Sequence, residues 1–309
     1  MRATPRIAGA DDHFVGTADV TLHVVEAGRG PLVVLLHGFP EFWWSWRHQL
    51  PALAAAGFRA IAVDMRGCGL SGRPRGVAAY SVARLAADVE ALLSALGVER
   101  AAAVVGHDWG GIVGYRFAAR YPQRLERLVV LNAPHPAAMA RGMLRNAQAL
   151  RSAYMLALMI PALPERVLAA RDGALLRRAL RAMRAAPVAD DEIEPYVEAA
   201  RQADWLRGGL DVYRAMARAI LARAPLAGRL LAPARRAPDR APSRRIEVPV
   251  LVIWGEEDPF LAPHLAAPPA TLVPNARVER VPGASHDVML DAPERVNALL
   301  LELLRGRGG

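Results

Sequence analysis

The fold of this chain is decided at residues 106–111, which read Gly-His-Asp-Trp-Gly-Gly directly after the apolar run Ala-Ala-Ala-Val-Val at 101–105. A strand that ends in glycine, any residue, nucleophile, any residue, glycine, and then turns into a helix, holds the central side chain exposed above a sheet. Small residues are a steric requirement there, because neighbouring backbone segments approach closely at the turn. The sequence therefore predicts a strained strand-to-helix turn that presents Asp108.

The central residue of this turn is an aspartate rather than a serine, and this changes the expected chemistry. A carboxylate that attacks an acyl carbon forms a labile anhydride. A carboxylate that attacks a saturated carbon forms an ordinary ester, which water can later cleave. We therefore expect the electrophile to be a saturated carbon that carries a leaving group, such as an epoxide or an alkyl halide.

Short apolar runs alternate with helix-like segments along much of the chain, a pattern typical of an α/β protein with a mostly parallel sheet. The expected strands are 20–25, 32–36, 59–63, 101–105, 128–131, 250–254 and 277–281. Helical periodicity marks residues 82–96, 110–120 and 293–304. The polar residues that follow these strands should gather where ligands of such sheets bind, beyond the carboxyl ends of the strands.

The strand-like runs stop between about residues 134 and 245. The pattern of this region predicts amphipathic helices at 137–154, 165–185, 190–203 and 210–224. They are followed by a linker that leads back to the sheet and contains Pro225, Pro233, Pro238 and Pro242. We expect residues 1–134 and 246–309 to form one core domain, a twisted and mostly parallel sheet flanked by helices. Residues 135–245 are then an inserted helical cap.

Composition limits the function only broadly. The 309 residues are 53% hydrophobic, and the single cysteine, Cys68, excludes an internal disulfide framework and favours a reducing compartment. Residues 135–245 carry 20 arginines against 10 acids, but without a nucleic-acid motif we interpret them as solvated helix faces. Residues 1–12 contain arginines but no apolar stretch, so we expect no secretory signal, and the longest apolar stretch, about 153–163, is too short to span a membrane. We expect a cytoplasmic protein, monomeric or homodimeric, that binds no nucleic acid.

Two polar side chains after later strands complete a catalytic constellation. Asp258 follows the expected strand 250–254, and His286 follows the last one. The chain order nucleophile, acid, histidine is the order that α/β-hydrolases use. We assign His286 as the base that activates water and Asp258 as the carboxylate that orients it, although Glu256 and Glu257 are close neighbours of Asp258. Asn132, which is not an acid, occupies the alternative position for an orienting carboxylate, so we expect no orienting carboxylate from that position.

Hydrolysis of an ester on Asp108 passes through an oxyanion, which needs hydrogen-bond donors. The backbone N–H of Trp109, directly after the nucleophile, is the expected first donor. The second is expected from the loop at 37–40, most naturally the N–H of Phe39, since Pro40 has no N–H. His107, beside the nucleophile, is interpreted as a packing residue of the turn.

Four motifs occur together in this chain: His-Gly-Phe-Pro-Glu at 37–41, Trp-Ser-Trp-Arg-His-Gln at 44–49, Asp-Met-Arg-Gly-Cys-Gly-Leu-Ser at 64–71, and the turn at 106–111. In this combination the chain resembles the α/β-hydrolase-fold epoxide hydrolases, especially the soluble type, from about His13 to its end. The resemblance implies the α/β-hydrolase fold and conversion of an apolar epoxide to a vicinal diol through a covalent ester on Asp108. It implies neither a metal nor an organic cofactor.

The same family opens epoxides with two cap tyrosines whose hydroxyls donate hydrogen bonds to the ring oxygen. Tyr154 and Tyr213 resemble those tyrosines, and a phenol suits the task because it is protonated at neutral pH. Tyr196 is interpreted as structural. Together with Phe39 and Trp109, we expect these apolar side chains to line the substrate pocket: Met155, Leu158, Met159, Trp205 and Met216.

One position departs from the family pattern. Family members commonly carry an aromatic residue directly after the histidine, whereas Asp287 stands here. The exchange removes a piece of the expected pocket wall and places a second acid beside the proposed base.

Three other readings of the chain remain open. Haloalkane dehalogenases share the aspartate turn followed by tryptophan but need a second halide donor, which the side chain of Phe39 does not offer. Fluoroacetate dehalogenases resemble the 37–40 loop but grip their substrate with arginines, where Trp109 and Ile112 stand here. A hydrolase-fold receptor would bind a ligand without turnover, and a missing triad member would favour it.

Overall fold

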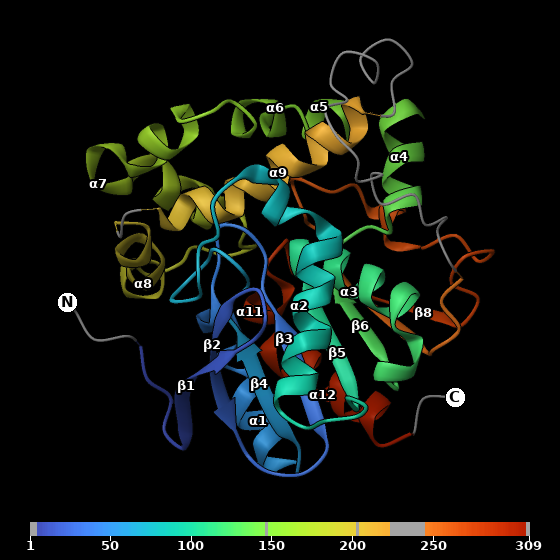
Figure 1. The fold of residues 1–309 in the computed structure, drawn as a ribbon. Helices are drawn as coiled ribbons and strands as arrows, with labels where there is room; N and C mark the ends of the chain where they lie inside the picture. The colour runs from blue at the N-terminus through green and yellow to red at the C-terminus, as the bar shows by residue number, and fades with distance from the viewer. Residues whose placement is uncertain (1–4, 146–147, 202–203, 223–244, 307–309) are drawn as a thin grey trace.

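One twisted sheet of eight strands organises the chain (Figure 1). The computed structural model describes residues 5–145, 148–201, 204–222 and 245–306. The strands lie in the order β1-β2-β4-β3-β5-β6-β7-β8. Their bounds are β1 (Ala10–Gly16), β2 (Thr21–Ala27), β3 (Leu32–Leu36), β4 (Arg59–Val63), β5 (Ala103–His107), β6 (Leu128–Leu131), β7 (Val250–Gly255) and β8 (Ala276–Val281).

The six strands from β3 to β8 pair in parallel, whereas β1 and β2 run antiparallel at one edge. The expected α/β fold with a mostly parallel sheet is confirmed. The parallel strands end at one edge of the sheet, so the polar residues that follow them meet there. Strand β1 was not expected, because its sequence Ala-Asp-Asp-His-Phe-Val-Gly is polar and mostly exposed at the sheet edge.

Helices cover both faces of the sheet and bury alternate residues of its strands. Val34 of β3 packs on one side with α2 (Val82–Ala95) and α3 (Trp109–Arg120), while Leu35 packs on the other with α1 (Gln49–Ala55) and α12 (Pro293–Leu304). The short helix α11 (Val288–Asp291) joins the second layer. Because both faces are covered, the central strands are continuous apolar runs, which is why sequence periodicity locates them.

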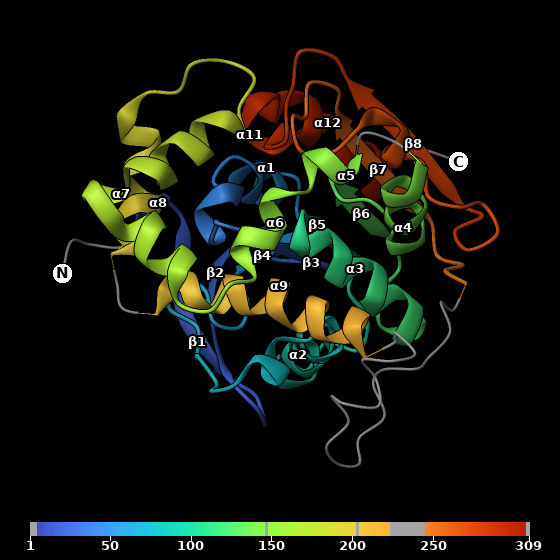
Figure 2. The same ribbon diagram turned by 90° about the horizontal axis from the view of Figure 1, so that it is seen from above.

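A set of helices is inserted between β6 and β7 and lies above the carboxyl ends of the strands (Figures 1 and 2). These helices are α4 (Pro136–Arg145), α5 (Gln148–Arg151), α6 (Tyr154–Leu158), α7 (Leu163–Ala182), α8 (Asp190–Ala200) and α9 (Trp205–Leu221). In the part of the chain that the structure describes, no single helix is long and apolar enough to cross a membrane. The segments 148–158 and 163–182 meet that test only as a pair bent by 90°.

The inserted helices differ from the expected ones in two places. Within the described residues, the expected helix at 137–154 is interrupted at Ser152–Ala153, between α5 and α6. A tertiary contact precedes the interruption, since the Gln148 side chain in α5 donates to the Phe260 carbonyl (2.8 Å) and accepts from the Ala262 N–H (2.9 Å). Helix α7 is kinked at residues 170–173, where Arg171 and Asp172 have positive φ. The four prolines of the expected return segment lie outside the described residues.

The turn after β5 sets a steric limit that can be tested by mutation. A Cβ added at Gly106 would lie 2.2 Å from the Gly110 carbonyl oxygen, whereas one at Gly16 meets nothing within 4 Å. We expect Gly106→Ala to lower the free energy of unfolding by at least about 1–3 kcal/mol, since backbone must move to admit the methyl group. Gly16→Ala, also in a strand, should change it far less. Urea denaturation of both variants measures this, and equal stabilities would contradict the steric account.

Candidate active site

The turn between β5 and α3 holds Asp108 in a strained conformation, with φ 46° and ψ −117°. A non-glycine residue rarely adopts this conformation, and such strain is typical of functional sites. The carboxylate lies at the N-terminus of α3, where the helix dipole favours negative charge. Burial raises the pKa of Asp108, while the charges of His286 and His107 and two backbone N–H groups oppose that rise.

The loop after β3 supplies a donor to this carboxylate. The Phe39 N–H donates to Asp108 Oδ2 at 3.1 Å, and the Trp109 N–H also interacts with the carboxylate. The approach is close, since a Cβ on Gly38 would lie 2.6 Å from the Asp108 Cβ. These are the two N–H groups that the sequence analysis expected near the nucleophile. The Phe39–Pro40 peptide bond is cis.

His37 fixes the loop that carries Phe39. Its Nδ1 lies 2.7 Å from the Gly38 carbonyl oxygen, which only accepts, and its Nε2 accepts from the Met65 N–H at 3.0 Å. This pair of contacts requires the neutral imidazole with hydrogen on Nδ1. Burial accordingly lowers the pKa of His37.

His286 and Asp258 meet above the sheet, with His286 Nδ1 2.7 Å from Asp258 Oδ2. The other Asp258 oxygen accepts from the backbone N–H groups of Phe260 (2.8 Å) and Leu261 (2.9 Å). Burial raises the pKa of Asp258, but the His286 charge and the hydrogen bonds lower it more, so the net pKa lies below the usual value. Asp258 is thus held ionised as the partner of His286.

Asn132 stands at the alternative position for an orienting acid. As expected it supplies no carboxylate there, but its amide binds the carboxylate of Asp258. Its Nδ2 donates to Asp258 Oδ2 at 2.8 Å, and its Oδ1 accepts from the Gly255 N–H at 2.8 Å. Asn132 has a φ of 37°, a conformation that asparagine tolerates better than most residues. The amide therefore ties the end of β6 to the loop after β7 and restrains the orientation of Asp258.

The charge state of His286 depends on its acidic neighbours. Burial lowers the pKa of His286, but the charge and hydrogen bond of Asp258, followed by the charge of Asp108, raise it more, to about 10. At neutral pH, with Asp108 ionised, His286 is therefore an imidazolium. Any change that removes the Asp108 charge removes one of the groups that keep His286 protonated.

The two expected tyrosines both lie near Asp108. Tyr213 of α9 is only 4% exposed and packs edge-on against Trp109 (ring centroids 4.9 Å apart) and Phe39 (5.7 Å). Tyr154, which begins α6, is 42% exposed and packs on Phe260 (5.6 Å).

The two phenol groups remain protonated. Burial and the charge of Asp108 raise the pKa of both Tyr154 and Tyr213, and each phenol also acts on the pKa of the other. Two protonated hydroxyls therefore share one region with the Asp108 carboxylate.

Most of the expected apolar lining packs in the same hydrophobic layer as Tyr213. Four side chains pack against the cluster that contains Trp109 and Tyr213: Met155, Leu158, Met159 and Met216. Trp205 packs elsewhere, edge-on against Phe42 with ring centroids 6.5 Å apart, in the layer that contains Leu35. Tyr196 lies in that layer too, with its hydroxyl 3.0 Å from Ser45 Oγ, in keeping with a structural role.

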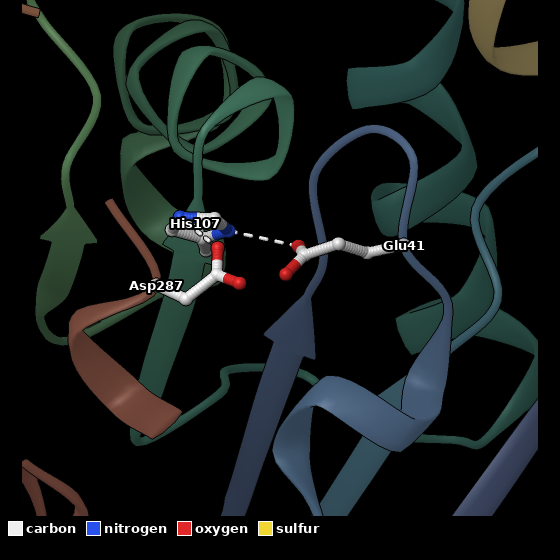
Figure 3. Close-up of side chains that lie close together, drawn as sticks. All are labelled: Glu41, His107 and Asp287. Atoms are coloured by element: carbon white, nitrogen blue, oxygen red, sulfur yellow. Dashed lines mark hydrogen bonds and ion pairs between the residues drawn. The ribbon is translucent and has the colours of Figure 1, made fainter. Parts of the chain in front are cut away.

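A second, fully buried group of titratable residues lies behind His286: Glu41, His107 and Asp287 (Figure 3). The His107 ring contacts the His286 ring edge-on at 4.8 Å. Its Nδ1 lies 2.8 Å from Glu41 Oε2, and its Nε2 lies 3.0 Å from the His286 carbonyl oxygen. His107 is thus packed into the turn as expected, but it also joins the turn to the His286 loop. Among the described residues this is the one cluster whose ligand atoms are close enough to hold a metal ion.

Comparison with known proteins agrees with this geometry. The model of the α/β-hydrolase fold family matches residues 31–293. The chain is 37% identical to the AB hydrolase superfamily protein YfhM of Bacillus subtilis (strain 168), covering 97% of this chain and 99% of that protein. It is 33% identical to Epoxide hydrolase 4 of Mus musculus, over 92% of this chain and 76% of that protein. The crystal structure of Bacillus megaterium epoxide hydrolase in complex with an inhibitor superposes with a TM-score of 0.81 at 27% identity, covering 95% and 100% of the two chains.

An Asp108 turn at the carboxyl edge of a parallel sheet, met by the Asp258–His286 pair, defines a protein of the α/β-hydrolase fold. Within that fold the chain belongs to the epoxide hydrolase family, with which it shares sequence over nearly its whole length. The resemblance drawn from the four sequence motifs is confirmed.

Proposed function

We propose that this protein converts an apolar epoxide and water to a vicinal diol through a covalent hydroxyalkyl ester on Asp108. The observation that carries the proposal is the set of groups around that carboxylate: the Phe39 N–H, the imidazole of His286, and the phenols of Tyr154 and Tyr213. We also propose that residues 135–245 act as a cap over the core formed by 1–134 and 246–309. The cap brings both tyrosines to the site.

Ring opening is the first step. Asp108 Oδ2 accepts from Phe39, so Oδ1 is the oxygen that attacks an epoxide carbon. The carbon–oxygen bond of the ring breaks as the ester bond forms, and negative charge develops on the leaving oxygen. Tyr154 and Tyr213 donate hydrogen bonds to that oxygen, and one of them supplies its proton, because an alkoxide is a poor leaving group without a donor.

Ester hydrolysis is the second step, and the loss of a charge prepares it. Once Asp108 is an ester it is neutral, so the pKa of His286 falls toward a range in which it can act as a base. His286 gives its proton back to the tyrosine that protonated the ring oxygen, and both side chains are then neutral. His286 then takes a proton from water as the hydroxide adds to the ester carbonyl of Asp108. The tetrahedral adduct breaks its bond to the alkyl oxygen, which takes the proton of the new carboxyl group and leaves as the diol, so that Asp108 is again a carboxylate and His286 an imidazolium. Phe39 and Trp109 N–H groups stabilise the oxyanion, and Asp258 stabilises the imidazolium.

The site favours an epoxide over a haloalkane. Release of a halide needs two hydrogen-bond donors of the protein that bind the departing ion, and it does not need a pair of phenols. Phe39 offers no side-chain donor at the position of the second halide contact. We therefore expect an aryl or alkyl epoxide to give diol while the matching haloalkane gives no halide, as measured by chromatography and halide titration. Halide without diol would establish a dehalogenase, and a retained ligand without either product would establish a receptor.

The covalent intermediate can be trapped by removing the base. In His286→Ala the first step still proceeds but water is no longer activated, so the ester should accumulate. Intact-protein mass spectrometry should show the chain plus one epoxide. His13→Ala, which removes a half-exposed histidine from β1, is the matched control and should turn over normally without an adduct. Normal turnover and unchanged mass in His286→Ala would refute the assignment.

The tyrosines are tested by removing their hydroxyls. Tyr154→Phe and Tyr213→Phe should each slow ring opening, and the double variant should lose about 10²–10⁴-fold in rate, the usual contribution of a general acid. Single-turnover ester formation measures this step alone. Tyr196→Phe removes a hydroxyl in the other layer and should leave the rate unchanged. Full activity in the double variant would remove both phenols from the mechanism.

A further inference from the structure

Asp287 is a buried acid that the proposed reaction does not use. Its backbone is fully engaged, since its N–H donates to the Met183 carbonyl (3.0 Å) and its own carbonyl accepts from Leu290 (2.8 Å) and Asp291 (3.0 Å). Its side chain, in contrast, points at Glu41 and His107 (Figure 3), and Asp287 Oδ1 is buried with no hydrogen-bond partner among the described residues. A buried carboxyl group in that state is costly.

Glu41 also has a buried carboxylate oxygen without a hydrogen-bond partner among the described residues. Its Oε2 accepts from the Gly38 N–H (2.8 Å) and contacts His107 Nδ1, but its Oε1 is buried and also lacks a partner in the described parts of the chain. Burial raises the pKa of Glu41, but the charge and hydrogen bond of His107, together with the Gly38 N–H, lower it more, to about 2. Glu41 is therefore an ionised acceptor with one free oxygen, and one ligand atom from each of Glu41, His107 and Asp287 lies within 4.8 Å of the other two.

Two ionised carboxylates cannot face each other at this depth, because like charges in a buried site push one pKa upward. Burial and the charge of Glu41 raise the pKa of Asp287, to about 8. A protonated Asp287 has a hydroxyl to donate, and Glu41 Oε1 has nothing to accept. The charged or titratable groups that act on Asp287 are Glu41, His107, His286, Arg184 and Tyr196.

A divalent cation is the competing occupant, since it would neutralise the same two carboxylates. It would have to take His107 through Nδ1, because Nε2 keeps its hydrogen to reach the His286 carbonyl. Nδ1 already lies 2.8 Å from Glu41 Oε2. A single proton can join the two carboxyl groups, because one oxygen of each lies within 4.8 Å of the other. It leaves in place the His107 hydrogen bonds and the 3.9 Å approach of Asp287 Oδ1 to His107 Nε2, so the contacts favour the proton.

We propose that Asp287 and Glu41 share one proton as a carboxylic acid–carboxylate pair, and that Asp287 in this neutral form is a positioning residue that keeps His286 able to act as a base. The second half rests on the proposed function. An ionised Asp287 would add negative charge beside His286 and hold the imidazole protonated when it must accept a proton from water. The shared proton removes that charge while His107 still anchors the His286 carbonyl.

The proton itself is tested without substrate. The infrared spectrum of the wild-type protein should contain a protonated-carboxyl band that titrates away near pH 8. The band should be absent in Asp287→Asn, whose amide can still donate to Glu41, and retained in the control Asp191→Asn, which changes an exposed acid. Absence of the band at neutral pH would overturn the proposal, as would one divalent metal ion per chain found by elemental analysis.

Stability supplies a second measurement that is independent of activity. An acid whose folded pKa is raised stabilises the fold fully below its unfolded pKa of about 3.9, and this contribution is lost as pH rises through the folded value. The difference between the melting temperatures of Asp287→Asn and the wild type should therefore shift in favour of the variant as pH increases. This difference should level off above about pH 8. A constant difference across this range would show that Asp287 is ionised throughout, and would overturn the proposal.

The effect on His286 is tested by the pH dependence of ester hydrolysis. In single-turnover experiments, the ratio of the Asp287→Asn rate to the wild-type rate should rise several-fold as pH passes through about 8, while the Asp191→Asn ratio stays flat. A flat ratio for Asp287→Asn would refute the positioning role. If the protein hydrolyses no epoxide, the proposed function fails at this step, but the infrared and melting data still decide whether the proton is shared.

Discussion

The structure around this site depends on one electrostatic constraint, the partial burial of the Asp108 carboxylate directly after β5. A buried charge is tolerated only when it is paired and hydrogen-bonded. Each surrounding feature answers that need: the Phe39 N–H donates to it, α3 begins beside it, and His286 carries the opposite charge. The same groups are those that the proposed reaction uses, because an oxyanion hole and a base are also a way to hold a carboxylate before substrate arrives.

The loops that meet at the site are fixed to one another by polar side chains that do not react. Asn132 ties the end of β6 to Asp258, and Glu41 joins the Phe39 loop to His107. His107 in turn holds the backbone of the His286 loop. Chains of buried hydrogen bonds of this kind are rigid when every member has a partner. They therefore set the distances between Asp108, His286 and the N–H groups of Phe39 and Trp109, which come from separate segments of the chain.

The sequence could predict those parts of the molecule that are set by local pattern. The strands β3 to β7 consist almost entirely of apolar residues, and β8 alternates apolar and charged ones, so they were located together with Asp108, Asp258 and His286, which follow strand ends. Strand β1 was missed because its exposed residues show no apolar run. The break between α5 and α6 was missed because the side chain of Gln148, in the turn before it, is held by residues more than a hundred positions away. Asn132, Glu41 and His107 can be read in the sequence, but their hydrogen-bond partners lie in distant loops and could be identified only from the structure. Trp205 was assigned to the pocket from its position in the inserted helices, whereas the structure buries it on Phe42.

The departure at residue 287 follows from the same electrostatic constraint. His107 donates to one oxygen of Glu41, so the other needs a neutral donor; an aromatic hydrocarbon at 287 could not supply one. A residue there with a permanent negative charge would add to the negative charge near His286 or compete with Asp258 for the imidazolium of His286. A carboxyl group whose proton is retained by its surroundings meets both conditions, because it donates a hydrogen bond and carries no charge. The unusual acid is thus consistent with the rest of the site, in which the charge on each side chain is determined by the charges packed around it.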